Sequence, residues 1–425
     1  MLRLLSSKVC QLTVGVGLCA ASVIPVGGAP AQASAVRYVV KDLGTLGGSF
    51  STGDSVNDLR WVAGASLLPG NTVEHATLWF RGFQFDLGTP GGLNSTIGWP
   101  VHNDHGLLPG IGEISASDPL GENFCHYGTG LECRGFAWEH GIMTTLSTLG
   151  GNNGQAAGAN NRDFIVGWAE DTTMDPTCTP PQVLQFEAVV WNPFFQAQVL
   201  PPLPGDPDGA AVAINNRGQV VGISGPCAGD DNNAGRHAVL WQNGTPTDLG
   251  NLGGTVFNVA DAINDRGEIA GFSALPGNMA YHAFFWTSST GIKDLGTLPG
   301  DVYSQAFGIN NRGQVVGGSC DANFYCRAFI WQHGVMRDLN ALIRPLSPLY
   351  LTFASDINQQ GDIAGSAYDQ STGIAPAFMA TPKTTGSNSN TMVTRANRPV
   401  LPERVRAALR LRSLYRGGAA MVRTL

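Results

Sequence analysis

The sequence predicts an all-β chain, a seven-bladed β-propeller with four strands per blade whose ring is closed by the N-terminal strand pairing with the last blade. Three observations lead to this fold class. A unit of four short apolar segments recurs, and its acidic marker Asp294 lies 46 residues after Asp248 and 44 residues before Asp338. That spacing is typical of one propeller blade. The unit is incomplete at the two ends of the chain in complementary ways, and 56 of the 425 residues are glycine, which suits many tight turns.

Each unit begins with a small-residue segment ending in Ile-Asn and continues with a Val-Val-Gly segment, an Ala-Phe-x-Trp segment and an Asp-Leu-Gly segment. Short apolar runs separated by Gly and Asn are typical of strands joined by turns. Complete units lie at 53–90, 96–150, 156–204, 211–252, 260–298 and 306–342. These six units predict six whole blades.

The two ends of the repeat region supply a seventh blade. Residues 38–46 are a fourth segment with nothing before it, and 354–358, 362–366 and 375–380 are three segments with no fourth after them. Joined, they complete a blade and leave no exposed strand edge in the ring. An open solenoid is the alternative, but it would not need complementary fragments at its ends.

An asparagine recurs at the end of the first segment, usually with glycine three residues later. The seven positions are Asn57, Asn103, Asn160, Asn215, Asn264, Asn310 and Asn358. Asn and Gly tolerate positive φ, and Asn bonds its own backbone, so tight hairpins between first and second strands account for them. A ring of polar ligands is the alternative reading of the same residues.

Aromatic and basic residues mark the third strand. It ends in tryptophan in six blades, at Trp79, Trp138, Trp191, Trp241, Trp286 and Trp331. We expect these rings to pack between blades, with an aromatic sugar-binding belt as the alternative. The same strand begins with His75, His237 and His282, and Arg134 and Arg327 take that place elsewhere. A position that accepts His or Arg indicates a hydrogen-bonded strand end rather than a catalytic base.

The flanking segments differ from the repeats in composition. Residues 1–35 have the basic, apolar and small-residue pattern of a secretory signal peptide, with a membrane anchor as the alternative; residues 36–380 form the propeller. Residues 381–425 are a polar linker and a basic tail, in which PERVRAALRLRSLYR predicts a short amphipathic helix or a frayed tail. We expect no stable membrane span.

Charge is divided between body and tail. Residues 36–380 hold 14 basic and 31 acidic residues, a net −17, whereas 381–425 hold 9 and 1, a net +8. An acidic body argues against nucleic acid as a partner, because phosphates need a basic surface. The opposite charges suggest that the tail docks on an acidic face of the body.

Six cysteines remain after the signal peptide, and all fall in the loops between second and third strands. An even number in an exported chain favours disulfides, and the absence of close pairs such as CxxC argues against zinc. Loop proximity predicts Cys125 with Cys133, Cys178 with Cys227, and Cys320 with Cys326. The chain is therefore expected to be secreted, in an extracellular or periplasmic location.

Alternate connections of a propeller emerge on one face, so the cysteine-bearing loops share a face with the Leu-Gly-Gly connections between blades. We expect a ligand-binding face there, because acids and exposed aromatics gather in these loops. Its candidate residues are Glu122, Phe124, Asp171, Asp175, Asp206, Asp208, Asp230, Asp231, Asp301, Tyr303, Asp321 and Tyr325.

Three motifs, read together, resemble a known family. They are HAFFW at 282–286, DLGTL at 294–298 and INNRGQVVG at 309–317. In this order they resemble the HAF family of extracellular repeat proteins, found largely in bacteria, over residues 38–380. The resemblance implies a secreted bacterial protein and carries no established activity. Blades two and three depart from it through long insertions and through HNDHG at 102–106.

Our first functional hypothesis is a secreted, non-catalytic binding or scaffold propeller, monomeric, with an extracellular glycan, a cationic surface or a protein as partner. The alternative is a lyase or glycosidase that uses loop carboxylates, Asp206 with Asp208 or Asp230 with Asp231. A weaker catalytic or metal candidate is His102 with His105 and the nearby Cys125-His126. No cofactor is expected, although Ca²⁺ is an ion that 206–209 or 230–233 could hold.

Overall fold

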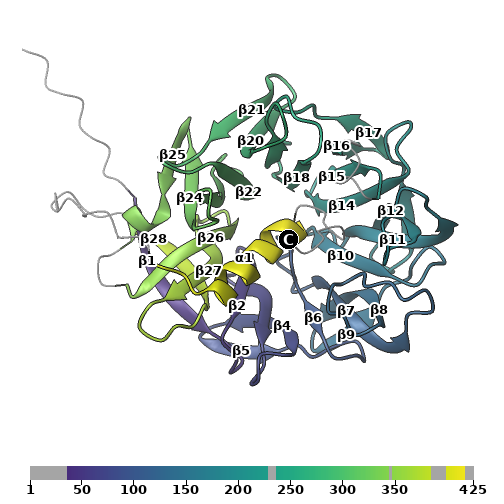
Figure 1. Ribbon diagram of the computed structural model, residues 1–425, viewed down its shortest axis with the longest axis horizontal. Coiled ribbons are helices and arrows are strands. Elements are labelled where there is room, and N and C mark those ends of the chain that lie inside the picture. The colour runs from purple at the N-terminus through teal and green to yellow at the C-terminus, as the bar shows by residue number, and fades with distance from the viewer. Residues whose placement is uncertain (1–35, 228–235, 344–346, 384–398, 417–425) are drawn as a thin grey trace, which may run out of the picture.

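The computed structural model describes residues 36–227, 236–343, 347–383 and 399–416. The expected signal peptide, Asp230, Asp231 and most of the linker lie outside these ranges. The described part forms seven four-stranded antiparallel sheets arranged as blades around a common centre (Figure 1). This confirms the predicted seven-bladed propeller. No helix among the described residues is long and apolar enough to cross a membrane.

Six blades follow one another along the chain, each built from the inner strand outward. Their strands are β2 (Ser51–Val56), β3 (Val62–Leu67), β4 (Glu74–Phe80) and β5 (Phe83–Asp86); β6 (Ser95–Thr96), β7 (Leu108–Ser117), β8 (Leu131–Glu139) and β9 (Ile142–Thr145); β10 (Gly154–Ala159), β11 (Ile165–Met174), β12 (Leu184–Trp191) and β13 (Ala197–Leu200); β14 (Asp208–Ile214), β15 (Val220–Gly225), β16 (His237–Gln242) and β17 (Thr245–Asp248); β18 (Asn258–Ile263), β19 (Ile269–Ala274), β20 (Tyr281–Thr287) and β21 (Gly291–Gly296); β22 (Tyr303–Ile309), β23 (Val315–Cys320), β24 (Cys326–Gln332) and β25 (Val335–Asp338).

The seventh blade joins the two ends of the repeat region. It contains β26 (Leu349–Ile357), β27 (Ile363–Asp369), β28 (Ala377–Lys383) and, outermost, β1 (Arg37–Gly44). β1 runs antiparallel to β28, with Val40 opposite Ala380, so the N-terminal strand closes the ring as predicted. β28 continues to Lys383, past the expected end of the repeats at residue 380. Two helical elements complete the chain, the 3-10 helix η1 (Leu339–Leu342) and the helix α1 (Glu403–Arg416).

The Val-Val-Gly motif has a steric origin. At Gly222, Gly271 and Gly317 an added Cβ would lie only 1.9 to 2.0 Å from a carbonyl oxygen of the neighbouring inner strand. The inner strand has a β-bulge beside each of these glycines, so its backbone approaches the second strand more closely than a side chain allows. Glycine at this position is therefore needed for the blade to form.

The recurring asparagines join each blade to the next. In six turns the Asn Oδ1 accepts two backbone N–H groups of its own turn, as Asn310 does from Arg312 and Gln314, and in the seventh Asn358 accepts that of Asp362. The Nδ2 group donates to the backbone carbonyl of the asparagine in the next blade. These bonds run from Asn57 to Asn103, Asn160, Asn215, Asn264, Asn310, Asn358 and back to Asn57. The turn interpretation is confirmed, and these side chains are already engaged rather than available to a ligand.

A second circle of hydrogen bonds involves the residue after each asparagine. The backbone N–H of this residue donates to the side-chain oxygen of its counterpart in the next blade, over 2.7 to 2.9 Å. The circle comprises Asp58, Asp104, Asn161, Asn216, Asp265, Asn311 and Gln359. Oxygen-bearing side chains are therefore required here in all seven blades.

The basic residue of the third strand pairs with the acid of the fourth strand in the same blade. His75 Nδ1 lies 2.8 Å from Asp86, and His282 Nδ1 lies 3.0 Å from Asp294. Arg327 occupies the same place and binds Asp338 over 3.2 Å. The His-Ala-Phe motif therefore lies on the third strand and the Asp-Leu-Gly motif on the fourth strand that pairs with it. The side chains of His and Asp join the two strands, as expected for a hydrogen-bonded strand end.

Tryptophan packing and three disulfides complete the frame. Trp79, Trp191 and Trp241 are buried, and the latter two donate from Nε1 to carbonyl oxygens of the preceding blade, over 3.1 and 2.7 Å. The disulfides are Cys125–Cys133, Cys178–Cys227 and Cys320–Cys326. They join the cysteines that loop proximity paired. Disulfides of this kind are typical of chains that fold in an oxidising compartment.

Candidate ligand-binding face

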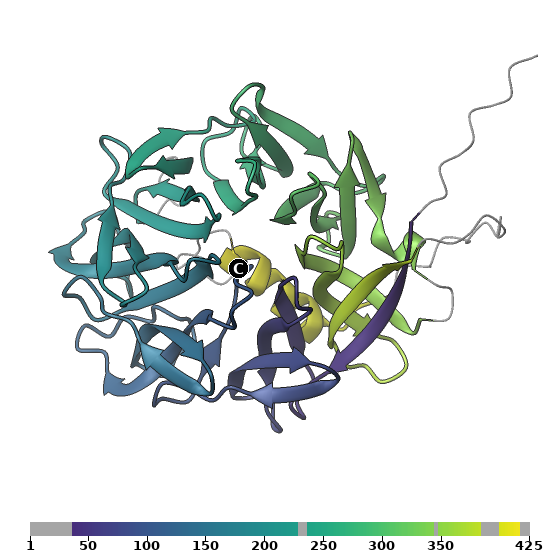
Figure 2. The same ribbon diagram turned by 180° about the vertical axis from the view of Figure 1, so that it is seen from behind.

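The loops between second and third strands and the connections between blades share one side of the ring, here called the loop face. Backbone bonds join the two sets, as when Gly48 N donates to Leu67 O and Gly254 N to Ala274 O. All three disulfides lie on this face. Helix α1 crosses it near the centre of the ring, in front of the blades in Figure 1 and behind them in Figure 2.

Four of the predicted face residues are buried. Glu122 is 1% exposed, and its Oε1 accepts the backbone N–H groups of Val183 and Leu184 in the next blade over 2.8 and 2.9 Å. Phe124 is 3% exposed and packs in a core cluster. Asp175 and Asp208 are buried as well. The expectation that these side chains face solvent is wrong, because they satisfy or cover the backbone of long loops.

The other acids also serve the loops in which they stand. Asp171 and Asp175 each accept the backbone N–H two residues on, and Asp321 accepts those of Asn323 and Tyr325. Asp206 accepts the Ser224 hydroxyl over 2.7 Å. Turns of this type hold the carboxylate against its own backbone. The predicted acidic surface is thus largely a set of turn-forming residues.

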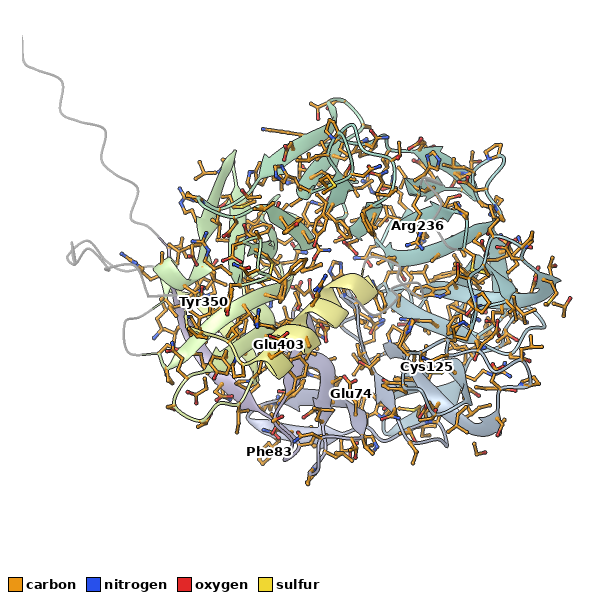
Figure 3. The ribbon with its side chains drawn as sticks, viewed as in Figure 1. Glu74, Phe83, Cys125, Arg236, Tyr350 and Glu403 are labelled. Atoms are coloured by element: carbon orange, nitrogen blue, oxygen red, sulfur yellow. A yellow bond between two sulfur atoms is a disulfide. The ribbon has the colours of Figure 1, made fainter. Side chains whose placement is uncertain are left out.

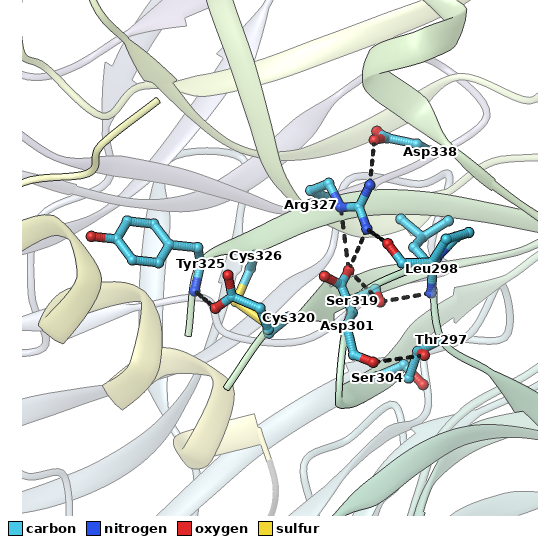
Figure 4. A network of polar contacts seen from close by, with 12 residues as sticks. Thr297, Leu298, Asp301, Ser304, Ser319, Cys320, Tyr325, Cys326, Arg327 and Asp338 are labelled. Carbon is cyan, nitrogen blue, oxygen red and sulfur yellow. Dashed lines mark hydrogen bonds and ion pairs between the residues drawn. A yellow bond between two sulfur atoms is a disulfide. The ribbon is translucent and has the colours of Figure 1, made fainter. Parts of the chain in front are cut away.

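Asp301 forms the best-defined ion pair on this face (Figure 4). Its side chain is fully buried, and its Oδ2 lies 2.8 Å from Arg327 Nη2 and 2.9 Å from the Ser319 hydroxyl. Arg327 also reaches Asp338, so one guanidinium joins the blade connection to two strands. Asp301 is therefore a structural residue of blade six.

Buried carboxyl groups cluster between blades two and three. Asn153 Nδ2 donates to both Glu122 Oε2 and Glu170 Oε2, over 3.2 and 3.1 Å. Burial raises the pKa of Glu170 to about 8, with the charge of Glu122 adding to the effect, and burial raises the pKa of Glu122 too. Two carboxyl groups held this close favour sharing a proton. Because both are almost fully buried, the pair has no access to a substrate.

A second acidic cluster lies beside the Cys178–Cys227 disulfide. Burial and a hydrogen bond with Asp175 raise the pKa of Asp208 to about 9. Burial and the charge of Asp171 raise the pKa of Glu187 to about 7. Asp175 approaches the two sulfur atoms closely enough for a metal site, but both sulfurs are bonded to each other and are not thiolate ligands.

The histidine candidate is not assembled. His102 and His105 lie on the opposite side of the ring from the loop face, at the Asn103 turn. His105 Nδ1 is 3.2 Å from Asp163, and His102 Nε2 is 3.5 Å from Asp356. Cys125 and His126 belong to the loop face, and Cys125 is in a disulfide. The structure therefore does not bring these residues together as one site.

Aromatic side chains form a continuous row on the loop face. Phe257 and Tyr281 have ring centroids 6.2 Å apart, Tyr281 and Tyr303 5.0 Å, and Tyr303 and Phe324 5.1 Å with nearly parallel rings. Tyr325 is the next residue along the chain. Tyr303 and Tyr325 belong to the predicted face, and the structure places Tyr303 in this row and Tyr325 in the hydrophobic cluster at its end.

Helix α1 packs against the end of the aromatic row. Leu401, Val405 and Leu409 are buried on one stripe of the tail. They pack in one cluster with Phe307, Phe353, Tyr368 and the Cys320–Cys326 disulfide, with Tyr303, Phe324 and Tyr325 around it. Figure 3 labels Glu403, the first residue of the helix. We call this cluster the α1 groove.

Two arginines of α1 lie over aromatic rings. The Arg406 guanidinium carbon is 5.0 Å from the centroid of Tyr325, and that of Arg410 is 4.8 Å from the centroid of Phe324. Arg406 also pairs with Glu403 within the helix. The described contacts of α1 with the blades are therefore apolar and cation–π, whereas the opposite charges of tail and body had suggested docking on an acidic face.

Sequence reasoning missed most of the α1 groove. Phe324, Phe257 and Tyr281 were not singled out, whereas the tail was predicted to form a short amphipathic helix or a frayed segment. The spacing of Leu401, Val405 and Leu409, four residues apart, was the available signal for one helix face. No comparable signal exists for Phe307 and Phe353, which lie in inner strands of neighbouring blades.

No protein-family model matches the chain, and no curated protein matches it in sequence. Solved structures resemble it in fold. The β-propeller domain of the Trilobed protease from Pyrococcus furiosus shares 7% identity over 85% of this chain and 98% of its own, with a TM-score of 0.48. Streptogramin B lyase shares 10% identity over 82% and 98%, with a TM-score of 0.43. A puromycin hydrolase variant shares 12% identity over 84% and 56%, with a TM-score of 0.45. At these identities the likeness concerns the fold alone.

Proposed function

We propose that this chain is an exported, non-catalytic binding propeller whose α1 groove binds basic amphipathic helices, and that its own helix α1 is one such ligand. The observation that carries the proposal is the placement of Val405 and Leu409 in the groove with Arg406 and Arg410 over Tyr325 and Phe324. The disulfides support export, and the motifs at 282–286, 294–298 and 309–317 support membership of the HAF family.

The chemistry of the groove matches such a ligand. Apolar side chains at every fourth position bury one face of a helix, and aromatic rings at the border attract guanidinium groups that remain partly hydrated. Flat aromatic rings with few rotatable bonds also lose little conformational entropy on binding. A protein partner with the same pattern of Leu or Val and Arg would use the same contacts.

The carboxylate candidates argue for a binder over an enzyme. A glycosidase or lyase needs acids that reach the substrate, with pKa values matched to proton transfer. Glu122, Glu170 and Asp208 have raised pKa values but are buried. Asp206 is held by Ser224.

Peptide binding tests the proposal. A labelled peptide of residues 399–416 is titrated by fluorescence anisotropy into the full chain and into a chain that ends at Lys383. We expect the shorter chain to bind at least about tenfold more tightly, because a tethered helix competes at a high effective concentration. A peptide with Val405→Asp and Leu409→Asp should not bind, and one with Ala407→Asp, on the exposed side, should bind nearly normally. Equal affinity of both chains for the unaltered peptide contradicts the proposal.

A further inference from the structure

A pocket of about 690 Å³ lies where β1 closes the ring, away from the loop face. Its walls come from β1, from the β2–β3 turn around Arg60 and Trp61, and from the β4–β5 turn between Phe80 and Phe83. Both turns open on the side of the ring opposite α1. The volume is within the range of pockets that hold small ligands.

The pocket contains a buried donor without an acceptor. Trp79 lines it, is 3% exposed, and its Nε1–H has no hydrogen-bond partner among the described residues. In blades three and four the equivalent Trp191 and Trp241 donate to Ser147 and Pro201 carbonyls of the preceding blade. In the closing blade the corresponding carbonyl, of Gly44, accepts the Ser51 hydroxyl over 2.7 Å. Because Nε1 itself is covered, Trp79 contributes ring surface to the wall of the pocket and does not present its N–H to a ligand.

Positive charge is concentrated at the same place. Lys41, Arg60 and Arg81 line the pocket, with Asp42 as the one acid among its lining residues. Three of the 14 basic residues of an otherwise acidic body thus meet here. Arg60 is held by buried Asp362 through Nε, over 2.8 Å, and Asp42 accepts the Gly44 N–H. The pocket therefore suits an anionic group.

Aromatic surface completes the lining. Trp61 and Phe80 have ring centroids 4.9 Å apart, and Arg81 lies over the Phe80 ring. Phe83 is 68% exposed at the pocket border, and Figure 3 shows it at the outer edge of the ring. An exposed phenylalanine beside a cationic pocket is not explained by packing. Such rings suit the apolar C–H face of a sugar ring.

We propose that this pocket binds an acidic sugar, a pyranose ring with a carboxylate. The sugar ring packs on Trp61 and Phe83, and its carboxylate lies near Arg81 and Lys41. The proposal is independent of the α1 groove, since it concerns other residues on the opposite side of the ring.

Calorimetric titration of the full chain with D-glucuronate, D-glucose and benzoate tests the assignment. We expect glucuronate to bind at least about tenfold more tightly than glucose, which lacks the charge-assisted hydrogen bonds, and more tightly than benzoate, which lacks the hydroxyls. Binding should weaken with salt. The proposal is overturned if glucose or benzoate binds as tightly as glucuronate. It is also overturned if glucuronate at about 20 mM, about 100-fold over the protein, gives no heat of binding.

Variants locate the site. Arg81→Ala and Lys41→Ala should each weaken glucuronate binding about fivefold or more, because each removes a cationic partner of the carboxylate. Phe83→Ala should also weaken it, whereas Ile142→Ala should not, because Ile142 is the exposed first residue of β9 at the matching place in blade two. Unchanged melting temperatures show that each variant is folded. Glucuronate affinity that is the same in Arg81→Ala and Lys41→Ala as in the parent chain contradicts the assignment.

Discussion

Asn358 donates a hydrogen bond from Nδ2 to the backbone carbonyl of Asn57 over 3.1 Å, although the two residues lie 301 positions apart in the chain. This bond completes the circle of seven asparagine bonds on the side of the ring opposite α1. The same closing blade pairs β1 with β28. The ends of the repeat region are therefore held together both at the outer strands and near the centre.

Replacing one asparagine of the circle should destabilise the ring. Asn310→Ala removes the bond to the Asn358 carbonyl and leaves the N–H groups of Arg312 and Gln314 without their acceptor. We expect the free energy of unfolding to fall by about 2 kcal/mol or more, because one buried and two part-buried hydrogen bonds are lost together. Urea unfolding measures the change. Asn323→Ala, at an exposed loop position, is the control, and an equal loss in both variants would contradict this role.

The disulfides should differ in their contribution to stability. Cys178–Cys227 spans 49 residues and joins two blades, whereas Cys320–Cys326 spans 6 within one loop. Loop-closure entropy predicts losses of about 4 and about 2 kcal/mol when each pair is changed to serine. Thermal unfolding of the two double variants compares them. A larger loss for the Cys320–Cys326 pair would show that its place beside α1, rather than loop length, decides the effect.

Stability should fall as pH rises from 5 to 8.5. Glu170 has a pKa near 8 in the folded chain, against an ordinary value near 4.5. A raised acid pKa means that the folded state holds its proton more firmly, so its stabilising effect is complete below about pH 4.5 and is lost as pH passes about 8. The melting temperature of Glu170→Gln should depend less on pH than that of the parent chain. Exposed Glu139→Gln should leave the parent dependence intact, and a flat parent profile contradicts the prediction.

Releasing α1 should free the groove for a ligand in trans. Val405→Asp places a charge in the buried stripe, and Ala407→Asp places the same charge on the exposed side of the helix. We expect the full chain with Val405→Asp to bind the 399–416 peptide about as tightly as the chain ending at Lys383 does. The Ala407→Asp chain should remain closed to the peptide. Weak binding by both variants would show that α1 does not control access.

Much of the fold follows from the sequence because the repeat carries it. The strands, the closing role of residues 38–46 and the pairing of Cys178 with Cys227 depend on period and on position within the unit. The Gly222 and His282 motifs follow from contacts inside one blade. Such local constraints recur in each copy and are therefore visible in one sequence.

The functional residues depend on contacts between blades and were less predictable. Glu122 looks like a loop acid in the sequence, but its partners Val183 and Leu184 belong to the next blade. The α1 groove combines residues of two blades with the tail, and an amphipathic stripe does not specify where it docks. The opposite net charges of body and tail predicted that the tail docks on the loop face. They did not predict that Arg406 and Arg410 lie over aromatic rings there.

Hydrogen exchange of α1 tests the central claim most directly. In the full chain, the backbone amides of 406–410 should exchange at least about tenfold more slowly than in the free 399–416 peptide, because docking suppresses local opening. Phe324→Ala with Tyr325→Ala should return them toward the rate of the free peptide, whereas Phe194→Ala, an exposed aromatic residue of another blade, should not. Amides of α1 that exchange as fast in the full chain as in the free peptide would contradict the account.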